Sequence, residues 1–177
     1  MTQKYNVAVA GATGAVGTEI VQILEQRDFP IDKLFLLASS KSKGKKVEFR
    51  DQEIVVEDLS EFDFSKVHIG LFSPGGKISA EFAPKAANAG CIVIDNTSHF
   101  RMQQNIPLVV PEVNANALDD FFDDENRTNI ISNPNCSTIQ MVVALKPLHE
   151  KAIINRVVVS TYQAVSGAGK TGMDELF

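Results

Sequence analysis

A glycine-rich turn close to the N-terminus constrains the fold of this chain more than any other feature. Residues 11–17 read GATGAVG and join an apolar run at 5–10 to a segment at 15–26 in which apolar side chains recur at helical spacing. A buried strand, a tight turn and an amphipathic helix in this order are typical of the start of a parallel α/β sheet. The alternation then continues, with predicted strands at 33–38, 67–72 and 91–95 and a predicted helix at 78–89.

We therefore predict an α/β fold with a Rossmann-type, doubly wound parallel sheet that carries helices on both faces. Residues 45–57 alternate polar and apolar side chains, which indicates a hairpin or a pair of short strands. A short helix at 114–122 and a strand at 129–132 complete this first part. Beyond it we expect a helix at 138–151, kinked or ended near Pro147, then a strand at 153–161 and the first turns of a last helix.

Composition bounds the classes of protein to which the chain can belong. With 177 residues, 44% of them hydrophobic, it can bury roughly 70% of its unfolded surface, enough for one core. A net charge of −5 argues against a nucleic-acid binder, and no run of apolar residues is long enough to cross a membrane. Two cysteines without a CxxC pair and three scattered histidines predict neither a disulfide framework nor a metal site. We expect a cytoplasmic protein.

The spacing of the glycines in the turn indicates a dinucleotide site. Gly11 and Gly14 allow the backbone to turn tightly and to approach a pyrophosphate, and the helix that follows offers free N–H groups and a partial positive charge. The placement between a first strand and a first helix supports this interpretation, since the motif GxxGxxG alone is weak evidence. The alternative is a tight turn that binds nothing.

The loop after the second predicted strand indicates which dinucleotide binds. An NAD site usually has an acidic residue there to hold the ribose 2′-hydroxyl, but residues 39–46 read SSKSKGKK. Hydroxyl and ammonium groups such as those of Ser39, Lys41 and Ser42 suit a 2′-phosphate and favour NADP. The alternative is a solvated basic loop.

Cys136 is the candidate nucleophile. It lies in the segment NPNCST at 133–138, which follows a predicted strand and opens a helix, and the partial charge at a helix N-terminus favours a thiolate. Such a thiolate can attack a carbonyl carbon, with Asn135 or a backbone N–H stabilising the oxyanion. Cys91 begins an apolar strand and is predicted to be buried and inert. A thiol nucleophile with NADP indicates aldehyde oxidation or acyl-phosphate reduction.

With these residues in view, the whole chain closely resembles the aspartate-semialdehyde dehydrogenase family. In that family, NADPH drives the reductive dephosphorylation of aspartyl phosphate to aspartate semialdehyde and phosphate, in the synthesis of lysine, threonine, methionine and diaminopimelate. The motifs that carry the resemblance are GATGAVG at 11–17, SSKSKGKK at 39–46, LFSPGG at 71–76, DNTSHFR at 95–101, PLVVPEVN at 107–114, NPNCSTIQMVVAL at 133–145 and VVSTYQAVSGAGK at 158–170.

The resemblance implies a role for each site residue. Cys136 would form the acyl thioester, Gln163 would orient the substrate, and Arg101 would bind the acyl phosphate or free phosphate. The alternatives are a surface-loop arginine for Arg101 and a strand-capping side chain for Gln163. The residues implied to hold the cofactor are Thr13, Gly14, Ala15 and Val16 at the pyrophosphate, Lys41 and Ser42 at the 2′-phosphate, and Ser166 and Gly167 at the nicotinamide.

The resemblance also implies two domains, a NADP-binding Rossmann domain at 1–132 and the beginning of an α+β catalytic and dimerisation domain at 133–177. Family members are considerably longer, and their second domain carries a histidine that acts as general acid/base, an arginine for the substrate carboxylate and much of the dimer surface. We therefore expect a fragment or truncated form that is weakly active or inactive alone. The full-length protein is expected to be a homodimer or tetramer.

Three alternative functions remain open from the residues. An N-acetyl-glutamyl-phosphate reductase shares the chemistry, but its cysteine is usually followed by tyrosine, and here Ser137 follows. A glyceraldehyde-3-phosphate dehydrogenase prefers NAD, which predicts an acidic residue after the second strand. A non-catalytic NADP-binding module would retain cofactor affinity alone. In any of these, a strand at 153–161 without partners would expose an apolar edge that favours self-association.

Overall fold

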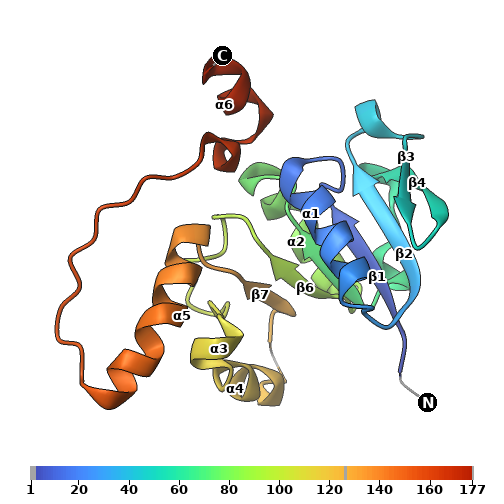
Figure 1. The fold of residues 1–177 in the computed structure, drawn as a ribbon. Coiled ribbons are helices and arrows are strands. Elements are labelled where there is room, and N and C mark those ends of the chain that lie inside the picture. The colour runs from blue at the N-terminus through green and yellow to red at the C-terminus, as the bar shows by residue number, and fades with distance from the viewer. Residues whose placement is uncertain (1–2, 126, 177) are drawn as a thin grey trace.

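A seven-stranded, mostly parallel sheet forms the centre of the computed structural model, which describes residues 3–125 and 127–176, with only the backbone at 166 and 168–171 (Figure 1). The strand order is β3-β4-β2-β1-β5-β6-β7. All neighbouring pairs are parallel except β3 and β4, which form an antiparallel hairpin at one edge. The strands are β1 (Tyr5–Ala10), β2 (Ile31–Ala38), β3 (Lys46–Phe49), β4 (Gln52–Asp58), β5 (Ile69–Phe72), β6 (Ile92–Asp95) and β7 (Ile130–Ser132).

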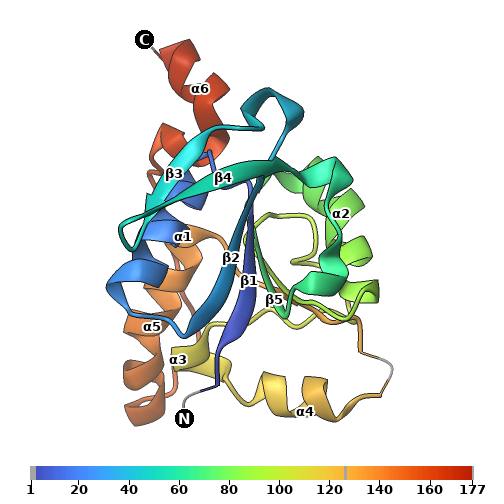
Figure 2. The same ribbon diagram turned by 90° about the vertical axis from the view of Figure 1, so that its right-hand side faces the viewer.

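Helices cover both faces of this sheet, which confirms the predicted doubly wound fold. In Figure 2, α1 lies on one side of the strands and α2 on the other. The α-helices are α1 (Ala15–Gln26), α2 (Gly76–Asn88), α3 (Pro111–Asn114), α4 (Ala117–Asp123), α5 (Cys136–Lys151) and α6 (Gly169–Leu176). None of the helices in the described residues is long and apolar enough to span a bilayer.

The side chains of β1 explain how two helical layers fit on one sheet. Val7 and Val9 point to the face covered by α1, where they share a core with Val21 and Leu24. The alternate residues Ala8 and Ala10 belong to the core on the face covered by α2. All four β1 side chains are buried, as expected for a central parallel strand with helices on both faces. This packing fixes the glycine turn at the carboxyl end of β1.

The predicted strand at 153–161 was wrong. These residues form no strand, and in Figure 1 they run as an open segment from α5 to α6. Ile153 and Val158 are each 78% exposed. β-Branched residues favour strands because they pack against neighbouring strands and a core, and the described residues offer neither here. The residue types therefore favour a strand, but none of the described strands pairs with this segment.

Two helices also differ from the prediction. The helix expected at 138–151 begins two residues earlier, at Cys136, and continues through Pro147 to Lys151. The helix expected at 114–122 is α4, which begins three residues later and ends one residue later, and the short helix α3 precedes it in a segment mostly without a predicted helix. No residue of α5 is buried, whereas β7 just before it is fully buried. The domain boundary at 132/133 stays a prediction.

Candidate cofactor and thiol site

Two of the three glycines in the turn are required by packing. Gly11 has φ +83°, and a Cβ atom at this position would lie 2.8 Å from the carbonyl carbon of Ser73. A Cβ atom at Gly17 would lie 2.1 Å from the carbonyl oxygen of Gly11. At Gly14 the nearest neighbour of such an atom is 3.3 Å away, so close packing demands glycine there much less. Gly14 is exposed, so a ligand can reach its backbone.

The N-terminus of α1 presents unused hydrogen-bond donors beside Gly14. Gly14 is the N-cap residue, and no side chain caps the helix. The backbone N–H groups of Ala15, Val16 and Gly17 donate to no other described residue, and no acidic side chain occupies the first turn. Free donors together with the helix dipole form a binding site for an anion such as a pyrophosphate.

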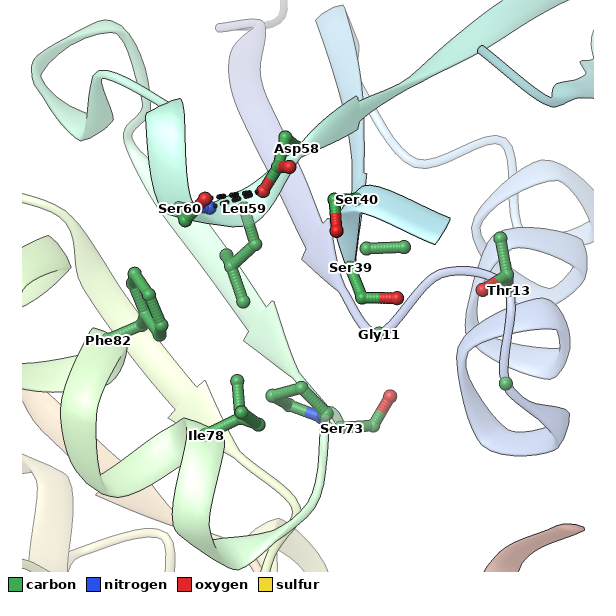
Figure 3. Close-up of a pocket in the computed structure, with 13 residues that line it drawn as sticks. Gly11, Thr13, Ser39, Ser40, Asp58, Leu59, Ser60, Ser73, Ile78 and Phe82 are labelled. Carbon is green, nitrogen blue, oxygen red and sulfur yellow. Dashed lines mark hydrogen bonds between the residues drawn. The ribbon is translucent and has the colours of Figure 1, made fainter. Parts of the chain in front are cut away.

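A cavity of about 430 Å³ opens next to this turn (Figure 3). Figure 3 shows Ser39 and Ser40 after β2 above Gly11 of the turn, and Ile78 and Phe82 of α2 across the cavity from them. The cavity therefore extends from the glycine turn to an apolar slot between Leu59, Ile78 and Phe82, and this lining suits the adenosine half of a dinucleotide.

The basic loop after β2 approaches the turn, but only part of its charge is free. Ser42 Oγ accepts a hydrogen bond from Thr13 Oγ1 at 3.3 Å, which places the loop beside the turn as predicted. Lys43 pairs with Glu61, and this hydrogen bond raises the pKa of Lys43; Lys46 pairs with Glu53 at 2.5 Å. In the described part of the chain, Lys41 and Lys45 form no ion pair. Of the four lysines in this loop, only Lys41 and Lys45 thus keep a charge that is available to a 2′-phosphate.

Asp58 is a residue of this cavity that the sequence analysis missed. No acidic residue follows β2, as predicted, but Asp58 ends the neighbouring strand β4 and pairs in register with Ala38, the last residue of β2. The hydroxyl of Ser60 donates to Asp58 Oδ1 at 2.7 Å and the N–H of Ser60 at 2.9 Å, and these bonds lower the pKa of Asp58. The only signal in the sequence is an acidic residue at the end of the alternating segment.

Cys136 is the first residue of α5 and is exposed. Asn135 caps the helix, because its Oδ1 accepts the N–H of Ser137 at 3.0 Å. The other end of the same amide, Asn135 Nδ2, donates to Oε1 of Gln163 at 3.4 Å. The structure thus brings together Asn135, Cys136 and Gln163, the three residues predicted around the reacting carbon.

A second cavity, of about 420 Å³, lies between α1 and α5. Cys136 and Gln163 line it together with Ala15 and Val16 of the first turn of α1. Gly167 also lines it, as expected for a residue near the nicotinamide, whereas the side chain of Ser166 lies outside the described part. The two cavities lie on either side of the N-terminus of α1, so one extended ligand can occupy both.

Arg101 is tied to the loop that carries Cys136. Its Nε donates to the carbonyl oxygen of Asn133 at 2.8 Å and its Nη2 to that of Asn96 at 3.0 Å. The N–H of Asn133 in turn donates to the carbonyl oxygen of Asp95 at 2.8 Å. These bonds contradict the alternative of a free surface arginine, but they assign no ligand to Arg101, whose phosphate contact stays a prediction.

Asp95 supports the same region from inside the protein, and the sequence analysis missed it. The side chain is fully buried at the end of β6. Its Oδ2 accepts the hydroxyl of Ser79 on α2, and its Oδ1 accepts the N–H and the hydroxyl of Thr97 at 2.8 and 2.7 Å. A buried carboxylate that accepts several hydrogen bonds holds the donor groups in place. The side chain of Asp95 therefore connects α2 to the loop before Arg101.

Neither the remaining cysteine nor any of the described histidines lines the two cavities. Cys91 is fully buried, and burial raises its pKa to about 12, which confirms the prediction of an inert residue. His68 accepts the N–H of Asn6, and His149 accepts the N–H of Ile154. Among the described residues that line the two cavities, none is a histidine. No group of metal-binding side chains occurs within residues 3–125 and 127–176.

Comparison with known proteins identifies related sequences over the whole chain. Residues 6–121 match the model of the NAD-binding domain of semialdehyde dehydrogenases, and residues 145–177 match the model of their dimerisation domain. The chain is 58% identical to aspartate-semialdehyde dehydrogenase 2 of Vibrio cholerae, a match that covers 99% of this chain and 51% of the relative. It is 56% identical to the aspartate-semialdehyde dehydrogenase of Legionella pneumophila, covering 99% and 50%.

Solved structures show the same relationship. The crystal structure of aspartate semialdehyde dehydrogenase II of Vibrio cholerae complexed with ASA superposes with a TM-score of 0.92 at 56% identity, covering 99% of this chain and 51% of that one. That of the Candida albicans enzyme with NADP gives 0.71 at 28% identity, covering 86% and 48%. The chain therefore spans about half the length of the relatives it matches.

Proposed function

Because the chain belongs to the semialdehyde dehydrogenase family, we propose that it carries the cofactor site and the nucleophile of an NADPH-dependent aspartate-semialdehyde dehydrogenase. This oxidoreductase converts L-aspartyl 4-phosphate to L-aspartate 4-semialdehyde and phosphate. The product serves the synthesis of lysine, threonine, methionine and diaminopimelate. Relatives at 50–58% identity that carry this name, and a relative solved with NADP, support the proposal.

One observation carries the proposal. Cys136 stands at the N-terminus of α5 in a cavity that Ala15 and Val16 of α1 also line, next to the cavity beside the glycine turn. A thiol and a nicotinamide must meet at one carbon atom if an acyl group on sulfur is to be reduced. Two helix N-termini converge on this cavity, and their partial positive charge suits the phosphate groups of a ligand.

The chain's own residues perform the acyl transfer. The Cys136 thiolate attacks the carbonyl carbon of the acyl phosphate, the bond from that carbon to the phosphate oxygen breaks, and a thioester remains. Asn135 Nδ2 donates one N–H to Gln163 and stabilises the oxyanion with its other N–H, while Gln163 orients the substrate. Arg101 binds the phosphate through the guanidinium N–H groups that the backbone carbonyls leave free. Bound NADPH supplies the hydride that reduces the thioester.

The residues around the first cavity fit this cofactor. Thr13, Gly14, Ala15 and Val16 surround the free donors for the pyrophosphate. Ser39, Lys41 and Ser42 hold the 2′-phosphate, and Ser166 and Gly167 contact the nicotinamide end. We also infer that the full-length protein is a cytoplasmic homodimer or tetramer and that it has no nucleic-acid or membrane partners. The two free cysteines and the match to a dimerisation domain support that setting.

A chimera tests the proposal. The 177 residues are joined to the part of the Vibrio cholerae relative that this chain does not cover, and NADPH formation from aspartate semialdehyde, phosphate and NADP is followed. We expect turnover by the chimera, background rates for its Cys136→Ser variant, and rates for the 177 residues alone that are lower by about 10²–10⁴, the usual contribution of a general acid/base.

Other outcomes would reject the proposal. A folded chimera that binds NADPH but gives no turnover would make the chain a non-catalytic cofactor-binding module. Turnover with N-acetyl-glutamate semialdehyde in place of aspartate semialdehyde would assign the alternative reductase. Full activity of the 177 residues alone would contradict the expectation that the chain lacks a catalytic group.

A further inference from the structure

The cavity beside the glycine turn contains a carboxylate to which no part of the proposed reaction assigns a role. Asp58 lines this cavity and is only 8% exposed. It belongs to the last residue pair of β4 and β2, and Figure 3 shows it beside Ser60 and Leu59, on the side of the cavity away from Thr13. An acidic residue in a site that otherwise suits phosphate groups requires a separate explanation.

The carboxylate is ionised and has acceptor capacity to spare. Its Oδ1 accepts both hydrogen bonds from Ser60, which keep the pKa of Asp58 low. Its Oδ2 accepts no hydrogen bond from any residue that the structure describes. An ionised carboxylate in a half-enclosed site gains free energy from a donor on the ligand. A ligand that occupies the cavity must therefore offer an N–H or O–H group to Asp58, or leave it unpaired.

The neighbours of Asp58 show which part of the cofactor lies next to it. Leu59, Ile78 and Phe82 face one another across the slot, and Figure 3 shows them grouped away from Thr13. Apolar walls of this kind suit a flat aromatic base, whereas the ribose and phosphate groups belong with Ser39 and the glycine turn. The base is thus the part of the cofactor that Asp58 meets.

We propose that Asp58 accepts a hydrogen bond from the exocyclic amino group of the base, and so makes the site selective for a 6-aminopurine. The proposal rests on the proposed function, since it assumes that NADPH binds in this cavity. Adenine carries an N–H donor at position 6. Bases with a carbonyl oxygen at that position would place an acceptor against the carboxylate, and a site that leaves a buried polar group unpaired discriminates strongly.

Titration with two cofactors tests this inference on the 177-residue chain. The affinity for NADPH is compared with that for the NADPH analogue in which purine, without the 6-amino group, replaces adenine. We expect the chain to prefer NADPH by about 10- to 100-fold, the range for a hydrogen bond to a charged group. In Asp58→Ala the ratio should fall to within about twofold, because the acceptor is gone.

Two further variants separate this role from a general loss of structure. Asp63 makes the same turn with Ser65, at 3.1 and 2.7 Å, but lies outside the cavity, so Asp63→Ala should keep the full ratio. Asp58→Asn keeps a capping acceptor for Ser60 without the charge, and its ratio should be about 2- to 10-fold, as for a neutral hydrogen bond.

The outcomes distinguish this inference from its premise. No NADPH binding by the unmodified chain would overturn the proposed function and the inference together. NADPH binding with equal affinity for the purine analogue would overturn the inference alone. So would an Asp58→Ala variant that loses affinity equally for both cofactors, or one that instead changes the preference between NADPH and NADH, since Asp58 would then contact the ribose.

Discussion

Arg101 donates from Nε to the carbonyl oxygen of Asn133 at 2.8 Å and thereby joins the loop after β6 to the loop that presents Cys136. Asn133 is held from its other side by the carbonyl oxygen of Asp95. The backbone three residues before the nucleophile is therefore fixed by two hydrogen bonds that do not involve the substrate. Arg101 thus has a structural role in addition to the proposed phosphate contact.

The structural role of Arg101 predicts a loss of stability that depends on its guanidinium. Arg101→Leu should lower the free energy of unfolding in urea by about 1–3 kcal/mol, because two partly buried carbonyl oxygens lose a charged donor. Arg27→Leu is the matched control, since Arg27 is exposed at the end of α1 and its side chain bonds to no described residue. Equal stability of the two variants would contradict the prediction. In the chimera, Arg101→Leu should also raise the KM for phosphate.

The glycine turn predicts opposite behaviour for two substitutions. Gly17→Ala should lower the free energy of unfolding by about 1–3 kcal/mol or more, because its methyl group would overlap the carbonyl oxygen of Gly11. Gly14→Val should cost only about 1 kcal/mol, as for an unfavourable N-cap residue, but weaken NADPH binding by at least about tenfold. Urea unfolding and NADPH titration measure the two effects. Unchanged NADPH binding in a folded Gly14→Val variant would reject the pyrophosphate site.

Much of this architecture follows from local sequence. The apolar runs that became β1, β2, β5 and β6 are recognisable one by one, and Gly17 is required by a contact within its own strand–turn–helix unit. Gly11, in contrast, is required by a contact with Ser73, which lies after β5. Asp58 could not be recognised in the same way, because its place beside Ala38 depends on the parallel pairing of β4 with β2. The pairing of Lys43 with Glu61 could not be recognised either, since Glu61 is 18 residues away in sequence. Long-range pairing decides both.

The two cysteines predict selective labelling. At mildly alkaline pH, iodoacetamide should modify Cys136 in the native protein and reach Cys91 only after unfolding, because Cys91 is fully buried and Cys136 is exposed. Peptide mass spectrometry locates the label. The Cys136→Ser variant serves as the control and should take up no label while folded. Labelling of Cys91 in that folded variant would contradict the structure.

The raised pKa of Cys91 also predicts a pH dependence of stability. The folded protein holds this thiol protonated up to about pH 12, whereas the unfolded chain ionises it near the ordinary value of about 8.5. The unfolded state therefore loses a proton first, and the contribution to stability is complete below about pH 8.5 and is lost as the pH rises toward 12. Between these pH values, the free energy of unfolding in urea should fall less steeply with pH for Cys91→Ala than for the unmodified chain. Identical slopes would reject this origin.

The open segment after α5 predicts self-association of the 177-residue chain. Ile153 and Val158 are each 78% exposed, and Tyr162 is completely exposed. Extended, unpaired backbone with apolar side chains favours pairing with a second copy. Sedimentation velocity should show a concentration-dependent increase in mass, which Val158→Lys reduces because a charged side chain opposes burial. Met102→Lys is the control, since Met102 is 91% exposed in a different loop and should leave association unchanged. A chain that stays monomeric at all concentrations, or equal effects of the two lysine substitutions, would contradict a role for this segment.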